Sequence, residues 1–260
     1  MKRTFFKYLA LFIVLCSIFS LTGFAESGEG WYLVKYEGKC PKFPQLYEFL
    51  KQHACYAIDE KASESGDKVL YLTFDAGYEN GNIERILDTL KSESVPAAFF
   101  ILSNLISKEP ALVKRMADEG HLVCNHTKNH KNLTRLDKDE IVANLAALEK
   151  EYEAATGRAM SKYFRYPEGY YSKDTALICE EAGYKTFFWS MAYADWDNAR
   201  QPSTDFAMKS LLKNTHPGAI VLLHPTSETN ADIMPDLIRA WRSMGYRFGT
   251  LDDLVLNQCT

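Results

Sequence analysis

Short apolar runs alternate with helical patterns along most of the chain, from residue 68 towards its end. Residues 69–74 form a run of β-branched and aromatic side chains, which predicts a buried strand. Residues 137–156 repeat apolar side chains every three or four positions, at Ile141, Leu145 and Leu148, which predicts a helix. The same pattern predicts strands at 97–102, 121–125, 163–165, 186–189, 219–223 and 247–248, and helices at 83–90, 110–119, 174–182, 205–214 and 232–244.

This alternation predicts an α/β fold with a parallel sheet and helices outside it. Strand and helix alternate about seven times, so we expect a closed or nearly closed (β/α) barrel rather than an open sheet. The regular pattern covers residues 68–256, which we predict to be one catalytic domain. Residues 26–67 have no long periodic stretch and are predicted to be a short N-terminal extension.

The first 25 residues differ from the rest of the chain. Lys2, Arg3 and Lys7 precede an apolar run, and Gly23 and Ala25 place small residues where a signal peptidase cleaves. We therefore predict a signal peptide at 1–25 and an extracytoplasmic protein, secreted or associated with the cell wall. The alternative is an uncleaved segment that anchors the chain in the membrane.

Charge and cysteine content narrow the possible partners. A formal net charge of −4 gives no electrostatic basis for binding nucleic acid, and we expect a monomer.

Removing Cys16 with the signal leaves five of the six cysteines, an odd number outside the cell. Cys40 and Cys55 are the best candidates for a disulfide, and Cys124 is predicted to be a small buried residue. No C-x-x-C pair is present, which argues against a thiolate zinc site.

Polar side chains follow almost every predicted strand. Asp75 ends the first, His126 ends the third, Arg165 ends the fourth and His224 ends the sixth. Asp195 follows the fifth strand. Because barrels carry their chemistry at the carboxyl ends of the strands, we expect these side chains to meet in one site.

The residue types suggest roles, each with a simpler alternative. His126 and His130 are four residues apart, so a helical turn would place both imidazoles on one side as metal ligands; two surface histidines are the alternative. Asp75 suits a metal ligand or a general base, or else a helix N-cap. Arg165 would orient Asp75 or Asp195, or form a surface ion pair.

His224 leaves an apolar run and suits a general acid that protonates a departing amine. Its alternative is a core histidine whose hydrogen bonds are satisfied.

Five motif blocks, in this order, resemble the polysaccharide deacetylases of carbohydrate esterase family 4, which share the NodB homology domain. The resemblance covers residues 68–253 and rests on 73–77 (TFDAG), 126–130 (HTKNH), 165–169 (RYPEG), 195–196 (DW) and 222–224 (LLH). It implies a distorted (β/α) barrel that hydrolyses N-acetyl groups of amino sugars.

The resemblance also implies roles for individual residues. His126 and His130 would hold a divalent metal, most simply zinc, while Asp75 acts as the base and His224 as the acid. Arg165 would orient Asp75, with Asp195 behind it. The backbone N–H of Glu168 would help hold the oxyanion. Five residues of these blocks would contact substrate: Tyr166, Glu168, Gly169, Trp196 and Leu222.

One position departs from the family pattern. The usual first block reads Thr-Phe-Asp-Asp, and its second Asp is the third metal ligand; here that position is Ala76, so we expect weaker metal affinity. The departure resembles the muramic-acid de-N-acetylases that prepare δ-lactam in spore-cortex peptidoglycan, although that subgroup often has a basic residue where this chain has Glu168. The expected substrate is N-acetylmuramic acid in peptidoglycan glycan strands. N-acetylglucosamine polymers, or a non-catalytic wall-binding module, are the alternatives.

Overall fold

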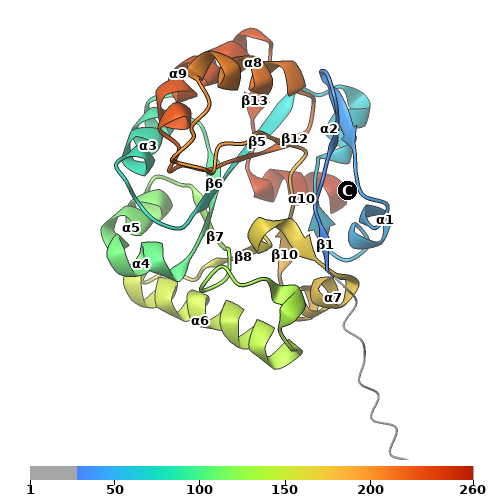
Figure 1. Ribbon diagram of the computed structural model, residues 1–260, viewed down its shortest axis with the longest axis vertical. Coiled ribbons are helices and arrows are strands. Elements are labelled where there is room, and N and C mark those ends of the chain that lie inside the picture. The colour runs from blue at the N-terminus through green and yellow to red at the C-terminus, as the bar shows by residue number, and fades with distance from the viewer. Residues whose placement is uncertain (1–27, 260) are drawn as a thin grey trace, which may run out of the picture.

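The computed structural model describes residues 28–259 and shows a curled parallel sheet surrounded by helices (Figure 1). The strand β5 (Val69–Ala76) pairs with three other strands, and every one of its residues except Asp75 is buried. The sheet runs in the order β11, β12, β5, β6, β7, β8, β10, β4, and β13 also pairs with β5. The bounds are β4 Cys55–Tyr56, β6 Ala97–Ile101, β7 Leu122–Asn125, β8 Ser161–Phe164, β10 Lys185–Phe187, β11 Met191–Ala192, β12 Ala219–Leu223 and β13 Arg247–Phe248.

Every strand pair in this sheet is parallel. Two contacts bring its ends together: Ile58, just past β4, forms a bridge with Ala219 of β12, and the Ser190 N–H donates to the carbonyl of Ile220. The sheet is therefore a distorted barrel, which confirms the predicted fold class.

Six of the described helices follow the predicted order, and four others, at 47–50, 60–65, 103–108 and 251–259, were not predicted. They are α1 Tyr47–Leu50, α2 Glu60–Ser65, α3 Asn82–Ser92, α4 Ser103–Lys108, α5 Pro110–Asp118, α6 Lys138–Thr156, α7 Lys173–Glu181, α8 Thr204–Asn214, α9 Glu228–Ser243 and α10 Leu251–Cys259. The longest, α6, begins at a capping box in which Asp137 and Glu140 each accept from the other's backbone N–H. It ends at Gly157, whose φ of 71° is readily adopted by glycine. No described helix is long and apolar enough to cross a membrane; the predicted signal peptide lies outside the described residues.

The segment before β5 packs on the barrel at several places. Strand β4 extends the main sheet beside β10, and β2 (Val34–Tyr36) pairs with β3 (Lys39–Lys42). The short strand β1 (Glu29–Gly30) pairs antiparallel with β9 (Tyr170–Tyr171), which belongs to the connection after β8. Figure 1 shows this first segment running past the end of the barrel where β8 and β10 finish. The boundary at residue 67 stays a prediction.

The predicted disulfide between Cys40 and Cys55 is wrong in this structure, where both are free thiols. The Cys40 thiol donates to the carbonyl of Pro41, and the Cys55 thiol donates to that of His53. The two lie on different strands, β3 and β4, which belong to different sheets. Cys124 is fully buried as predicted.

Candidate active site

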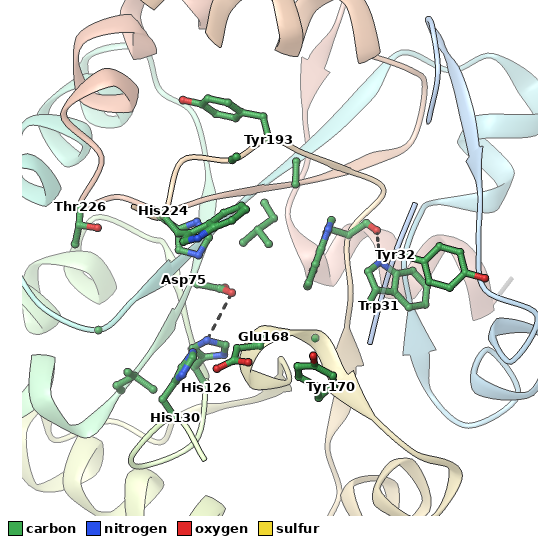
Figure 2. Close-up of a pocket in the computed structure, with 18 of the residues that line it drawn as sticks. Trp31, Tyr32, Asp75, His126, His130, Glu168, Tyr170, Tyr193, His224 and Thr226 are labelled. Carbon is green, nitrogen blue, oxygen red and sulfur yellow. Dashed lines mark hydrogen bonds and ion pairs between the residues drawn. The ribbon is translucent and has the colours of Figure 1, made fainter. Parts of the chain in front are cut away.

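A cavity of about 920 Å³ opens at the carboxyl ends of the barrel strands (Figure 2). Asp75, His126, His130 and His224 all line it, so the fold brings together the histidines and the aspartate expected from three motif blocks. Arg165 and Asp195 lie behind this surface, with side chains no more than 1% exposed. They act on the cavity through the residues that they contact.

Asp75 and Arg165 form a buried ion pair. Arg165 Nη1 donates to Asp75 Oδ1 at 2.9 Å, while its Nε and Nη2 donate to the carbonyls of Phe187 and Phe188. Three donors are therefore fixed at once, which is a task for a planar guanidinium. Burial alone would raise the pKa of Asp75, but the surrounding positive charges, Arg165 first, outweigh burial and lower that pKa. Asp75 is therefore an anion whose Oδ2 takes no part in the contact with Arg165.

The second pair joins Asp195 to His224. Asp195 Oδ1 lies 2.7 Å from His224 Nδ1, and its Oδ2 accepts from the His224 backbone N–H at 2.8 Å. Asn230 donates to the same Oδ2 and to the His224 carbonyl. Burial alone would lower the pKa of His224, but the hydrogen bond and charge of Asp195 outweigh burial and raise it. His224 is thus held ready to donate a proton.

The expectation that Asp195 stands behind Arg165 is therefore corrected. Asp195 bonds to His224 and Asn230, whereas the Arg165 side chain bonds to Asp75 and two backbone carbonyls. The sequence could not separate these pairings, because both acids follow strands of the same barrel. Asn230 lies six residues after His224 on α9, where nothing in the apolar pattern identified it.

His126 and His130 fit a metal-binding role. Their ring centroids lie 5.1 Å apart with planes inclined by 68°. His126 Nδ1 lies 2.9 Å from the carbonyl oxygen of Arg165, which can only accept, so the proton sits on Nδ1 and the Nε2 lone pair is free. Burial lowers the pKa of His126 to about 4, which keeps the ring in the neutral form that ligates metals.

The helical turn predicted for these histidines is wrong. Residues 126–130 form a loop, with positive φ of 71° at Thr127 and 57° at His130. The buried side chain of Asn125 accepts from the Thr127 N–H, and the Thr127 hydroxyl accepts from the His130 N–H. Local hydrogen bonds of this kind compete with helix and here bring both rings to the cavity.

The two imidazoles fit a divalent cation, but they are not joined by a third protein ligand among the described residues. Asp75 Oδ2 lies 3.6 Å from His126 Nε2. Ala76, the position of the usual third ligand, is fully buried in the apolar core and does not line the cavity. Within residues 28–259, no group of three or more His, Cys, Asp or Glu side chains is placed to hold a metal. Water or substrate would have to complete the coordination.

The residues expected to contact substrate fall into two sets. Glu168, Gly169, Trp196 and Leu222 line the cavity. Tyr166 does not: its side chain is 1% exposed, packs within an apolar cluster, and its hydroxyl contacts Cys179 Sγ at 3.8 Å. The phenol of Tyr166 is therefore a core group, and the expected substrate contact is corrected.

Part of the cavity wall was missed by the motifs. Trp31, Tyr32 and Leu33, from the segment after β1, line it together with Tyr78 and Tyr170. The first three belong to the part of the sequence without a periodic pattern, so no signal in the chain placed them near Asp75.

Comparison with known proteins identifies the family of this chain. Residues 62–187 match the family model described as polysaccharide deacetylase. The chain is 38% identical over 192 residues to the peptidoglycan-N-acetylmuramic acid deacetylase PdaA of Bacillus subtilis, covering 74% of this chain and 73% of that protein. The chain belongs to the polysaccharide deacetylase family. This deacetylase is accordingly a hydrolase of N-acetyl amide bonds.

Solved structures place the deacetylase in carbohydrate esterase family 4. The structure of B. subtilis PdaA, described as a family 4 carbohydrate esterase, superposes with a TM-score of 0.84 at 33% identity, covering 89% of this chain and 98% of that one. A peptidoglycan-N-acetylglucosamine deacetylase of Bacillus cereus is 32% identical, covering 70% of this chain and 66% of that protein. A family 4 pseudoenzyme from Bacillus anthracis, BA3943, has a TM-score of 0.67 at 28% identity, covering 72% of this chain and 65% of that one.

Proposed function

We propose that this deacetylase removes the acetyl group from N-acetylmuramic acid in peptidoglycan glycan strands outside the cytoplasm. In the subgroup that it resembles, this step leads to muramic δ-lactam in the spore cortex. The observation that carries the proposal is that one cavity holds both a proton acceptor and a proton donor. Asp75 is held as an anion by Arg165, and His224 is held towards its protonated form by Asp195. Similarity to PdaA supports the muramic acid assignment.

The two groups account for amide hydrolysis in balanced steps. Asp75 takes a proton from water as the water oxygen adds to the acetyl carbonyl carbon. The carbonyl oxygen gains negative charge, and the backbone N–H of Glu168 is the donor proposed to stabilise it. The C–N bond then breaks, its electron pair stays on nitrogen, and His224 supplies the proton that makes the leaving group an amine. Acetate is the other product.

His126 and His130 are the residues that would hold a divalent cation. Such an ion supplies a Lewis acid for the acetyl carbonyl and lowers the pKa of water. Neutral imidazoles favour zinc or another late first-row ion. Arg165 and Asp195 are positioning residues, because they act through Asp75 and His224.

A direct assay tests the proposal. Peptide-free glycan strands are incubated with the purified protein, with and without chelator, and released acetate and free amines are measured. We expect release that is lost in Asp75→Asn and His224→Ala. His53→Ala is the matched histidine control, since His53 pairs with Glu180 away from the cavity. No release with any metal or glycan, as expected of a pseudoenzyme, would overturn the catalytic proposal.

One observation favours a second candidate, an N-acetylglucosamine deacetylase. Asp75 and Glu168 line the cavity, whereas none of its described lining residues is lysine or arginine. Muramic acid carries a carboxylate that N-acetylglucosamine lacks. The negative charge of Glu168 would repel that carboxylate. Mass spectrometry of the products, which shows which sugar lost its acetyl group, decides between the two.

The Glu168→Lys variant sharpens that test, with Glu168→Gln as the control that removes charge without reversing it. If muramic acid is the substrate, Glu168→Lys should raise kcat/KM on strands with free carboxylates by about tenfold, and Glu168→Gln by less. Equal kcat/KM in all three proteins would show that this charge does not contribute to substrate choice.

A further inference from the structure

Exposed aromatic side chains gather at the mouth of the catalytic cavity. Among the side chains that the structure describes, the large exposed tyrosines and tryptophans are Tyr32, Tyr78, Tyr170 and Trp196. All four line the cavity. Exposed apolar surface concentrated in this way indicates a binding surface rather than incidental exposure.

Two of these rings lie away from the reacting groups. Tyr32 is 58% exposed and Tyr170 is 39% exposed. Figure 2 shows Tyr32 on the opposite side of the cavity from His224, and Tyr170 beyond Glu168 on the side away from His130. A sugar whose acetyl group lies between Asp75 and His224 would therefore leave these rings free for another part of the substrate.

The main chain that presents Tyr32 is firmly seated. The Trp31 N–H donates to the Gly169 carbonyl, and Trp31 Nε1 donates to the Trp189 carbonyl, both at 2.9 Å. The Trp31 ring stacks on Phe188 with centroids 4.2 Å apart. The seat is close-packed, because a Cβ at Gly169 would come within 2.8 Å of Trp189 and 3.0 Å of Trp31. The neighbouring tyrosine is thus presented with little freedom left to lose on binding.

Gly30 ties the second ring to the same segment. It is the register partner of Tyr170 in the β1–β9 pair, and a Cβ built on it would contact the Tyr170 ring at 3.5 Å. Tyr32 and Tyr170 are therefore held on one small structural unit, in which a strand from the N-terminal segment meets the connection after β8.

We propose that Tyr32 and Tyr170 form a platform for a pyranose ring of the glycan next to the sugar that loses its acetyl group. This inference rests on the proposed function, because it assumes a polymeric glycan in the cavity. A pyranose presents a face of C–H groups, which packs against the electron-rich face of an aromatic ring. At about 920 Å³, the cavity lies towards the upper end of the range for ligand sites, roughly 300–1,000 Å³.

The platform makes glycan length matter. A strand that covers both the reacting groups and the tyrosines gains contacts that a shorter sugar cannot make. The affinity of the protein for a hexamer should therefore exceed its affinity for a monosaccharide, and that difference should depend on Tyr32 and Tyr170.

Calorimetric titration tests the platform. Peptide-free glycan strands, an N-acetylglucosamine hexamer and the matching monosaccharides are titrated into the full protein carrying Asp75→Asn, which prevents turnover. Tyr32→Ala and Tyr170→Ala are added singly to this background. Phe206→Ala is the matched control, because Phe206 is also 58% exposed but lies on α8 outside the cavity. Melting temperatures report whether each variant is folded.

We expect Tyr32→Ala and Tyr170→Ala each to raise Kd for the longer glycans by about tenfold, and to change Kd for the monosaccharides less. Phe206→Ala should leave Kd unchanged for every ligand. Tyr32→Trp should retain the affinity for long glycans. Unchanged Kd in both alanine variants would overturn the platform, while acetate release by the native protein would leave the proposed function standing. If the protein bound neither glycan, and the native protein released no acetate, both proposals would be wrong.

Discussion

The contact between Asp195 and His224 controls the charge of the proposed acid. Because Asp195 raises the pKa of His224, the imidazole stays protonated to higher pH than it would alone. Activity that needs this proton is present below the pKa of His224 and is lost as the pH rises through it. Asp195→Asn should therefore move the alkaline limb of the kcat/KM profile to lower pH and reduce kcat on the order of 10²-fold.

The same pair links stability to pH with a definite sign. A raised pKa in the folded state gives stabilisation that is full at low pH and disappears as the pH rises through that value. The unfolding free energies of the native protein and Asp195→Asn should therefore converge at alkaline pH. Asp197→Asn is the control, because Asp197 bonds to Arg200 in the solvent. If the alkaline limb of the kcat/KM profile did not move in Asp195→Asn, His224 would not be the general acid.

Ala76 provides a second test at the level of one residue. A carboxylate added next to Asp75 should tighten zinc binding, and we expect Kd for zinc to fall by at least about tenfold in Ala76→Asp. Because Ala76 is fully buried among apolar side chains, the same change should lower the melting temperature of the metal-free protein. Calorimetry with zinc and a thermal melt measure the two effects. Unchanged zinc affinity would show that position 76 cannot reach the metal site.

Some residues of the site were predictable from the sequence and others were not. Asp75 and His224 end strands with clear apolar patterns, so the barrel rule placed them together. Asn230 was not predictable, since it lies on a helix and acts only because that helix packs beside the β12 end. Tyr166 shows the opposite error, because membership of a motif block does not specify which way a side chain points.

At the level of elements, the sequence pattern could not predict the loop 126–130 or the strand β1. A spacing of four residues suits a helix, but the buried Asn125 binds the Thr127 N–H and favours a loop. The two-residue strand β1 pairs with residues about 140 positions away, so its place depends on a contact that no local pattern contains. Helix α6, by contrast, was predictable, because its capping residues and its apolar repeat both lie within one continuous stretch of sequence.

Trp31 is the anchor of the first segment, and its removal tests that segment's contribution. Trp31→Ala should reduce the free energy of unfolding by roughly 3–5 kcal/mol, because a 7%-exposed indole leaves a cavity and an unpaired carbonyl. Urea denaturation measures the change. The neighbouring variant Tyr32→Ala removes an exposed ring and should stay within about 0.5 kcal/mol of the native protein. Equal stability of the two variants would show that Trp31 does not anchor the segment.

For the whole molecule, the alternation of strands and helices in the sequence predicted the barrel. The spacing of the cysteines did not predict their pairing. Spacing suggested Cys40 with Cys55, whereas the structure keeps Cys55, Cys124 and Cys179 as buried thiols. Burial raises the pKa of the Cys124 thiol and that of Cys179, so both should react slowly.

Alkylation followed by peptide mass mapping checks this arrangement. In the native protein Cys40, which is only partly buried, should be labelled at least about tenfold faster than Cys124 or Cys179. After unfolding without reductant, all four of the described thiols should be labelled. If Cys40 and Cys55 both resisted alkylation in the unfolded chain, the predicted disulfide would be present after all.

The seat of Tyr32 also determines how far the enzyme could reach into the wall. Tyr32 follows the predicted cleavage point after Ala25 by seven residues, and an extended chain spans at most about 3.5 Å per residue. A protein still held by its signal would keep the cavity mouth within roughly 25 Å of the point of attachment. Such a protein would modify only the innermost glycan layer, whereas a released one could act through the whole thickness of the wall.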